Sequence, residues 1–207
     1  MLEDSGPEAL RARPLTAEVG TSTQALYTLF GGMPGLFEAL VADGFGRFAE
    51  YVASVPETDD AVADFFAKGW AYSEWALAHP QLYRLMFGVT GGGLRRHAGL
   101  EMTVSGAVAH SPGARSAMDV LVDSMERVVA SGRIGPVEPV LAAGQFLSAT
   151  HGFVLLAIAG VFPLEGDGLG VARSMAINLM VGLGDVEEDA KRSLSLVEAS
   201  KAGSAPA

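Results

Sequence analysis

The stretch VGTSTQALYTLFGGMPGLFEAL, residues 19–40, constrains the fold of this chain more than any other segment. A Gly-Thr-Ser turn precedes the short amphipathic segment TQALYTLF, Gly31-Gly32 ends that segment, and Pro34 follows. Serine and threonine favour the start of a helix, glycine favours its end, and proline suits a first turn. This order predicts a helix-turn-helix. The alternative is two packed helices joined by a capped turn, with a purely structural role.

The rest of the chain predicts a larger helical body. Apolar residues recur at helical spacing, and we expect helices at about 34–54, 58–78, 114–131, 139–161 and 171–183. Residues 88–113 are rich in glycine and predict a long loop, and no alternating strand pattern is visible. Residues 185–207 are charged and then small and polar, which predicts a frayed helix and tail. The acidic cluster Asp185, Glu187, Glu188 and Asp189 is interpreted as a solvated helix start. The expected fold class is all-α.

Composition excludes several classes of protein. Hydrophobic residues make up 49% of the chain and charged residues 18%, so a sizeable core is expected and global disorder is not. The absence of cysteine excludes disulfides and fits a cytoplasmic location. The apolar run FVLLAIAGVF, residues 153–162, is half of the ~20 residues that a membrane span needs, so we expect a buried helix and no membrane partner. A net charge of −10 argues against nonspecific nucleic-acid binding by the whole surface.

Catalytic chemistry finds little support. The four histidines show no metal-ligand spacing, and Gly91-Gly92-Gly93 lacks the Gly-Lys-Ser/Thr of a phosphate loop. We therefore expect no enzyme activity, no metal site and no cofactor.

The segment after Gly20 has the residues that a DNA-reading helix needs. Small and polar side chains at the first turn of such a helix let the backbone approach the groove and let hydroxyls or amides reach phosphates and base edges. Residues 21–24 are Thr-Ser-Thr-Gln, and Tyr27 adds a hydroxyl one turn later.

The same stretch closely resembles the helix-turn-helix of TetR-family transcriptional regulators. The matching positions are Ala17 or Thr16, Val19, Gly20, Thr21, Ser22, Leu26, Tyr27, Phe30, Met33 and Leu36. FLSATHGFVLLAIAG, residues 146–160, further resembles a subgroup with a C-terminal His-Gly pair.

The resemblance implies a homodimeric DNA-binding regulator, a repressor released from a double-stranded DNA operator by a small apolar effector. Residues 1–47 would be the helix-turn-helix module, with a truncated first helix, and residues 48–207 the helical effector-binding and dimerisation domain. The last two long helices would form a four-helix dimer interface. The DNA-facing residues would be Thr21, Ser22, Thr23, Gln24, Tyr27 and Thr28, with Tyr27 at a phosphate.

The chain departs from the family pattern at positions that matter for DNA affinity. Six residues precede Pro7, where the family has a full first helix, and Met33 replaces a lysine that contacts phosphate. Residues 1–50 hold three arginines against seven carboxylates. Because counterion release supplies most DNA affinity, we expect this chain to bind DNA weakly or not at all. The alternative function is a helical small-molecule-binding or dimerisation protein with a vestigial DNA-binding head.

A second set of residues predicts an apolar ligand cavity with a few polar tips. Its candidates are Trp70, Tyr72, Trp75, Tyr83, Met86, Phe87, Met118, Met125, Phe146, His151 and Phe153. Each could instead be an ordinary core residue, and His151 a satisfied core histidine. The small-residue stripe Gly144, Ser148 and Gly152 suggests a dimer seam or close packing within one subunit.

Overall fold

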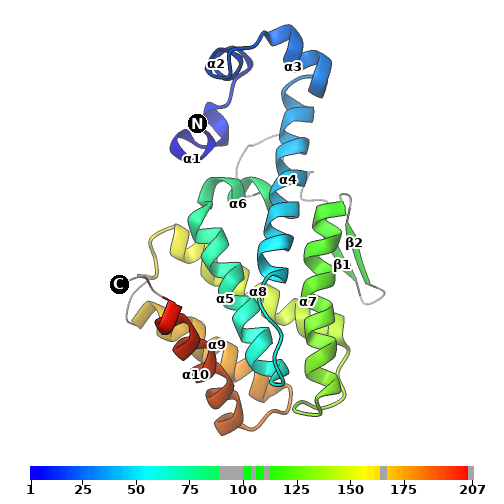
Figure 1. Cartoon of the computed structure of the whole chain (residues 1–207), viewed down its shortest axis with the longest axis vertical. Helices are drawn as coiled ribbons and strands as arrows, with labels where there is room; N and C mark the ends of the chain where they lie inside the picture. The colour runs from blue at the N-terminus through cyan, green and yellow to red at the C-terminus, as the bar shows by residue number, and fades with distance from the viewer. Residues whose placement is uncertain (89–99, 104–105, 110–111, 164–166, 205–207) are drawn as a thin grey trace.

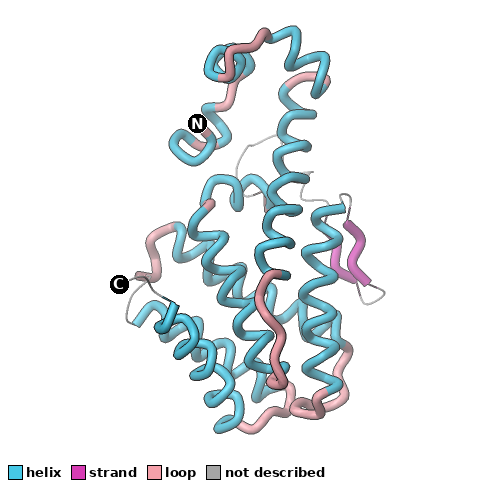
Figure 2. Tube along the Cα trace, in the orientation of Figure 1, coloured by secondary structure: helices cyan, strands magenta, loops and turns pink. Residues whose placement is uncertain are grey.

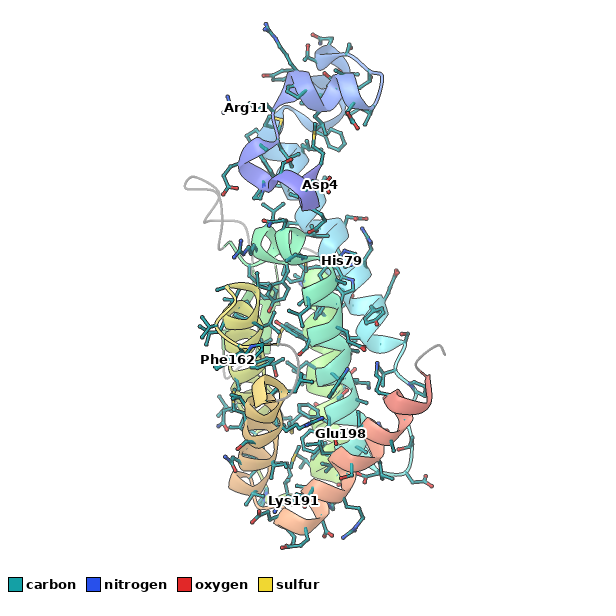
Figure 3. The ribbon with its side chains drawn as sticks, turned by 90° about the vertical axis from the view of Figure 1, so that its left-hand side faces the viewer. Asp4, Arg11, His79, Phe162, Lys191 and Glu198 are labelled. Carbon is teal, nitrogen blue, oxygen red and sulfur yellow. The ribbon has the colours of Figure 1, made fainter. Side chains whose placement is uncertain are left out.

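The computed structural model describes residues 1–88, 100–103, 106–109, 112–163 and 167–204. A small group of short helices, the head, stands at one end of a larger helical body (Figure 1). In the view turned by 90°, Asp4 and Arg11 mark the head and Lys191 lies at the opposite end (Figure 3). The all-α fold class is confirmed, apart from one short hairpin described below.

The head contains the predicted pair of short helices. Its elements are α1 (Leu2–Ser5), a 3₁₀ turn (Pro7–Ala9), α2 (Ala12–Glu18) and α3 (Thr23–Phe30), and α4 (Met33–Ala53) leads out of it. The Ser22 hydroxyl caps α3 by accepting a hydrogen bond from the backbone nitrogen of Ala25, at 3.1 Å. Gly31 ends α3 in the left-handed conformation, with φ of 69°. The local capping signals therefore fold as the sequence predicts.

The body consists of longer helices around two apolar clusters. They are α5 (Ala61–Ala78), α6 (Pro80–Met86), α7 (Pro112–Ala130), α8 (Pro139–Ile158), α9 (Asp167–Gly182) and α10 (Glu187–Ser204). One cluster, nearer the head, includes the fully buried residues Tyr83 and Val154. The other includes Val62, Met125 and Met180 and lies farther from the head. The body therefore has two separate apolar centres.

Close backbone approach holds the middle of α4 against two body helices. A Cβ atom on Gly44 would lie 2.8 Å from Sδ of Met86 on α6. A Cβ atom on Gly113 of α7 would lie 2.7 Å from the backbone nitrogen of Gly46. Side chains do not pack that closely, so these glycines let α6 and α7 touch α4.

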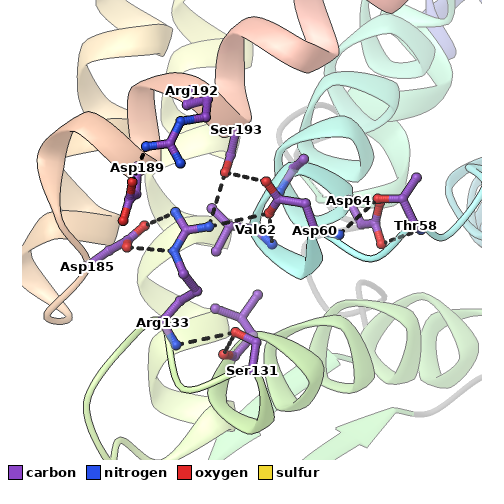
Figure 4. Close-up of polar contacts among 12 residues, drawn as sticks. Thr58, Asp60, Val62, Asp64, Ser131, Arg133, Asp185, Asp189, Arg192 and Ser193 are labelled. Atoms are coloured by element: carbon purple, nitrogen blue, oxygen red, sulfur yellow. Dashed lines mark hydrogen bonds and ion pairs between the residues drawn. The ribbon is translucent and has the colours of Figure 1, made fainter.

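The C-terminal segment is a packed helix, and the expectation of a frayed helix and tail is wrong for residues 187–204. Helix α10 buries Ala190, Leu194 and Val197, which share one face. Arg133 fixes the start of this helix, because its guanidinium donates to both carboxylate oxygens of Asp185 at 2.9 and 2.8 Å (Figure 4). The Asp185 side chain is 1% exposed, so it is not part of a solvated helix start.

The same polar cluster ties α10 to α5. Asp60 caps α5, because one of its carboxylate oxygens accepts hydrogen bonds from the backbone nitrogens of Val62 and Ala63, both at 3.0 Å. Its other oxygen accepts from the hydroxyl of Ser193 on α10, at 2.7 Å (Figure 4). These contacts between distant parts of the chain stabilise α10 in addition to its apolar face.

Two short strands form an antiparallel hairpin, β1 (Leu100–Thr103) and β2 (Gly106–Ala109), which lies beside α7 (Figure 2). Leu100 pairs with Ala109, and Thr103 pairs with Gly106. The sequence of residues 88–113 predicted a loop, because four-residue strands are too short to show alternation. The hairpin supplies the strands of the described parts of the chain, and the rest of the predicted loop between residues 89 and 111 lies outside the residues that the structure describes.

Candidate functional site

Helix α3 turns a polar face to solvent. Of the six residues predicted to face DNA, Thr21, Ser22, Gln24, Tyr27 and Thr28 are exposed and Thr23 is half-buried. Tyr27 is 57% exposed, whereas Leu26, on the opposite side of α3, is buried. The hydroxyl of Thr28 donates to the backbone oxygen of Gln24, at 2.9 Å. The predicted residues therefore share one accessible surface.

This surface holds little positive charge. Helix α3 has no basic residue, and the nearest cations in sequence are Arg11 and Arg13 at the start of α2. Both arginines are exposed and form no ion pair with any residue that the structure describes. Val19 and Leu29 add apolar side chains that are 66% and 74% exposed. The two arginines are therefore the cations that the head could offer to a phosphate backbone.

Glu3 connects the head to the body. Its two carboxylate oxygens accept hydrogen bonds from the backbone nitrogens of Gln81 and Leu82, each at 3.1 Å. These nitrogens belong to the first turn of α6, whose N–H groups have no partner within the helix. A carboxylate there also complements the positive end of the helix dipole. The N-terminal segment thus caps a body helix.

A cavity of about 360 Å³ lies inside the body, among α4, α5, α7, α8 and α9. This volume is at the lower end of the range for small-molecule sites, which is roughly 300–1,000 Å³. Six of the predicted residues line it: Trp70, Tyr72, Phe87, Met118, Phe146 and Phe153. Trp75, Tyr83, Met86 and Met125 are buried elsewhere in the core, and His151 is half-buried beside the cavity without lining it.

Several lining residues were not singled out from the sequence. Helix α4 supplies Phe45, Phe48 and Val52, and α5 supplies Phe65, Phe66 and Lys68. The helical spacing of the phenylalanines indicates which side of a helix faces inward. It does not indicate whether that side meets another side chain or an open space.

Three titratable side chains form a hydrogen-bonded cluster at one end of the cavity. The hydroxyl of Tyr83 lies 2.6 Å from the hydroxyl of Tyr72 and 2.5 Å from Nδ1 of His151. Burial raises the pKa of both tyrosines and lowers the pKa of His151. All three are therefore neutral near pH 7, and Tyr72 is the member that reaches the cavity wall.

Lys68 is a buried cation in the cavity wall. Its ammonium group donates to Oε1 of Glu57 and to the hydroxyl of Ser124, both at 2.9 Å. Glu57 does not line the cavity, and its side chain is 53% exposed. The hydrogen bond and the charge of Lys68 lower the pKa of Glu57. Lys68 is thus neutralised from outside the cavity.

The other charged residues of the cavity wall are paired with α10. Glu74 lies 2.6 Å from the ammonium of Lys201, and Arg173 forms an ion pair with Glu198. Among the described residues, Lys68, Glu74 and Arg173 are the ionised groups that line the cavity. Each has a partner of opposite charge within this chain.

Helix α8 keeps an apolar outer face. Among the described helices, α8 is the one whose length and hydropathy match a membrane span, and a third of it is buried. Helices α3 and α4 taken together also reach that length and hydropathy, with a bend of 62° between them. Core helices of soluble proteins have the same composition. Leu141 and Leu156 are 49% and 43% exposed.

The small-residue stripe lies on this helix. Ser148 is exposed, and a Cβ atom on Gly152 would meet no atom within 4 Å. Close packing within the subunit therefore does not explain the glycine at this position.

Comparison with known proteins gives a family and a fold. The model described as "Tetracyclin repressor-like, C-terminal domain" matches residues 65–177, which is more than half of the chain. No curated protein matches the sequence.

Solved structures with the same fold include a protein of unknown function from Rhodococcus sp. RHA1. It is 27% identical, covers 89% of this chain and 90% of its own, and has a TM-score of 0.69. A candidate regulatory protein, SCO4313, is 23% identical over 86% of this chain and 88% of its own, with a TM-score of 0.62. A candidate TetR-family transcription regulator from Shewanella sp. PV-4 is 21% identical over 88% of this chain and 92% of its own, with a TM-score of 0.54.

Proposed function

We infer the function of this chain from its family: it belongs to the TetR, or tetracycline-repressor-like, family of transcriptional regulators. We propose that it is a DNA-binding repressor, a homodimer released from its operator by a small apolar effector. The observation that carries this proposal is the path of α4, which begins beside the exposed face of α3 and supplies Phe45, Phe48 and Val52 to the cavity wall.

The DNA-contacting surface in this proposal is the exposed face of α3. Thr21, Ser22 and Thr23 would approach the backbone, Gln24 would reach a base edge, and Tyr27 would donate to a phosphate. The polar character and exposure of this face support the assignment. The module would comprise residues 1–47, and the effector-binding and dimerisation domain residues 48–207, although α4 crosses this boundary without a break.

Dimerisation would place α8 and α9 of two subunits face to face. The support is the apolar composition of α8, its low burial, and the open space around Gly152. Burying these exposed leucines against a second copy would contribute on the order of 25 cal/mol per Å² of apolar surface. The partner is a second copy of this chain, because a pair of like stripes is self-complementary about a two-fold axis.

Control by an effector requires that the ligand bind one arrangement of the two heads better than the other. A ligand in the cavity would touch α4 through its phenylalanines and would touch Tyr72, which is hydrogen-bonded to Tyr83 of α6. Both helices reach the head, α4 directly and α6 through Glu3. Two routes therefore join the cavity to the DNA-contacting surface.

A selection experiment tests the DNA-binding part of this proposal. Double-stranded DNA is selected from a random library with the purified protein, and the affinity of the best sequence is measured by fluorescence anisotropy at several salt concentrations. We expect Gln24→Ala and Tyr27→Phe to weaken binding, each by about threefold or more, whereas Ser195→Ala at an exposed position of α10 leaves it unchanged. Failure to enrich any sequence would contradict the proposal.

A second candidate function is favoured by one observation. The cation-poor, partly apolar surface of the head, with Leu29 exposed, is unusual for a DNA-contacting surface. It favours a small-molecule-binding, dimeric helical protein whose head no longer binds DNA. Selective ligand binding combined with no DNA enrichment in the same selection would identify this function.

A further inference from the structure

We propose that the cavity accepts an uncharged, largely aromatic or aliphatic molecule with one hydrogen-bonding group, and that it discriminates against carboxylates and ammonium ions of the same shape. This inference rests on the proposed function, since it names the chemical class of the effector.

The walls of the cavity are mostly apolar. Aromatic rings from three helices (α4, α5 and α8) and from the segment after α6 surround the space, among them Phe48, Phe65, Trp70 and Phe146. These side chains offer an apolar ligand a large contact area, and the phenylalanine rings among them offer an ionised group no hydrogen bond. Transfer of an unpaired charge into such surroundings is strongly unfavourable.

The charges in the wall do not offset that cost, because they are already satisfied. Lys68 is bound to Glu57 at 2.9 Å, and the other two ionised lining groups are paired with α10. A carboxylate that approached Lys68 would have to displace Glu57 or enter next to it. An ammonium ion would meet the repulsion of Lys68. A neutral ligand leaves all three ion pairs intact.

A single polar group on the ligand has partners available. Thr150 lines the cavity, and its hydroxyl has no hydrogen bond to a residue that the structure describes. The hydroxyl of Tyr72 lies 2.6 Å from that of Tyr83 and 3.3 Å from Nδ1 of His151, and a phenol oxygen has a further lone pair to offer. One alcohol or amide on the ligand can therefore be satisfied where a charge cannot.

Three probes of matched shape test this selectivity. Phenylbutanol, phenylbutanoate and phenylbutylammonium are titrated into the full chain at neutral pH by isothermal calorimetry. We expect the alcohol to bind at least about tenfold more tightly than either ion. A carboxylate or amine that binds as tightly as the alcohol overturns the proposal, and so does a failure of all three probes to bind.

Two pairs of variants locate the effect. Ala117 lines the cavity and Ala130 is exposed at the end of the same helix, so Ala117→Leu should abolish binding of the alcohol and Ala130→Leu should preserve it. If Ala117→Leu does not fold by circular dichroism, Ala149→Leu on α8 makes the same test from another wall. Binding that survives a folded cavity-filling variant overturns the proposed location.

The second pair changes the charge without changing the cavity walls. Glu57→Gln leaves Lys68 without its counter-charge, so the preference for alcohol over carboxylate should fall by at least about threefold. Glu126→Gln, at an exposed position of α7, should leave the preference unchanged. An unchanged preference in Glu57→Gln contradicts the role assigned to the ion pair.

The anisotropy measurement on the same samples, without ligand, separates this inference from the proposed function. If the protein binds DNA but shows no preference for the neutral probe, the proposed regulator function stands and the proposed uncharged effector is overturned. If the protein prefers the neutral probe but binds no DNA, the proposed specificity of the cavity stands and the proposed repressor function is overturned.

Discussion

The hydroxyl oxygen of Tyr83 lies 2.5 Å from Nδ1 of His151, in a cluster that burial keeps neutral. Neutral imidazole can accept this hydrogen bond on Nδ1, and a phenol that is itself buried can donate it. The pair joins α6 to α8 beside the cavity. Its strength therefore depends on the protonation state of His151.

We expect His151 to make the folded state less stable in mild acid. Burial lowers the pKa of His151 in the folded protein, while the unfolded chain keeps a histidine pKa of about 6.5. As pH falls through about 6.5, the unfolded state takes up the proton first, so the free energy of unfolding decreases. Above that pH, His151 does not change the free energy of unfolding with pH. Urea denaturation between about pH 8 and pH 5 should show that the free energy of unfolding decreases less in His151→Gln than in the unmodified protein. Parallel curves for the two proteins would contradict this assignment.

Asp185→Asn should destabilise the protein by about 2–3 kcal/mol, because it leaves the guanidinium of Arg133 without its bidentate partner in a partly buried site. Glu187→Gln, two residues away, removes an exposed pair with Lys191 and should cost less than about 0.5 kcal/mol. Urea denaturation of both variants measures the difference. Equal effects would show that the buried carboxylate does not anchor α10.

Leu156→Asp should convert a dimer to a monomer without loss of helix content. The leucine is 43% exposed on the apolar face of α8, and a carboxylate there would be buried unpaired in the proposed interface. Leu196→Asp places the same charge at a leucine that is 54% exposed on α10, and should leave the oligomeric state unchanged. Sedimentation velocity with circular dichroism distinguishes the two, and a dimer that persists in Leu156→Asp would place the interface elsewhere.

Met33→Lys should strengthen DNA binding by the head. Met33 is the first residue of α4, and a lysine there can reach a phosphate. One added phosphate contact steepens the dependence of log affinity on log salt by about 0.9 and raises affinity about twofold to tenfold at moderate salt. Leu196→Lys adds the same charge far from the head and should have neither effect. Anisotropy titrations of a selected sequence at several salt concentrations decide the matter.

The short-range features of the head were predictable from sequence because their causes are local. The serine that caps α3 and the glycine that ends it act within four residues of their partners, so a single stretch of chain contains the whole signal. The exposed polar face of α3 follows from the same spacing. The length of α4 was also apparent, since its apolar stripe repeats over many turns.

The features that were missed depend on contacts between distant residues. Asp185 and Glu187 look alike in the sequence, yet one is buried against Arg133 and the other is exposed. Helix α10, which follows, buries the polar Ser193 beside Ala190, Leu194 and Val197, so its apolar face is weak in the sequence. Likewise, Phe48 lines a cavity while Trp75 fills the core, although both lie on apolar helix faces. Which one meets a void is decided by the relative placement of five helices.

The tight crossing at Gly44 has a mechanical consequence for α4. We infer that α4 pivots near this crossing, where Gly44 and Gly113 bring α6 and α7 against its backbone. The arm from Gly44 to Met33 spans about 17 Å and the arm to Val52 about 12 Å, at a rise of 1.5 Å per residue. A ligand that pushes the cavity arm of α4 outward would swing the head in the opposite direction. Because the head arm is longer, the head would move through a larger distance than the cavity arm.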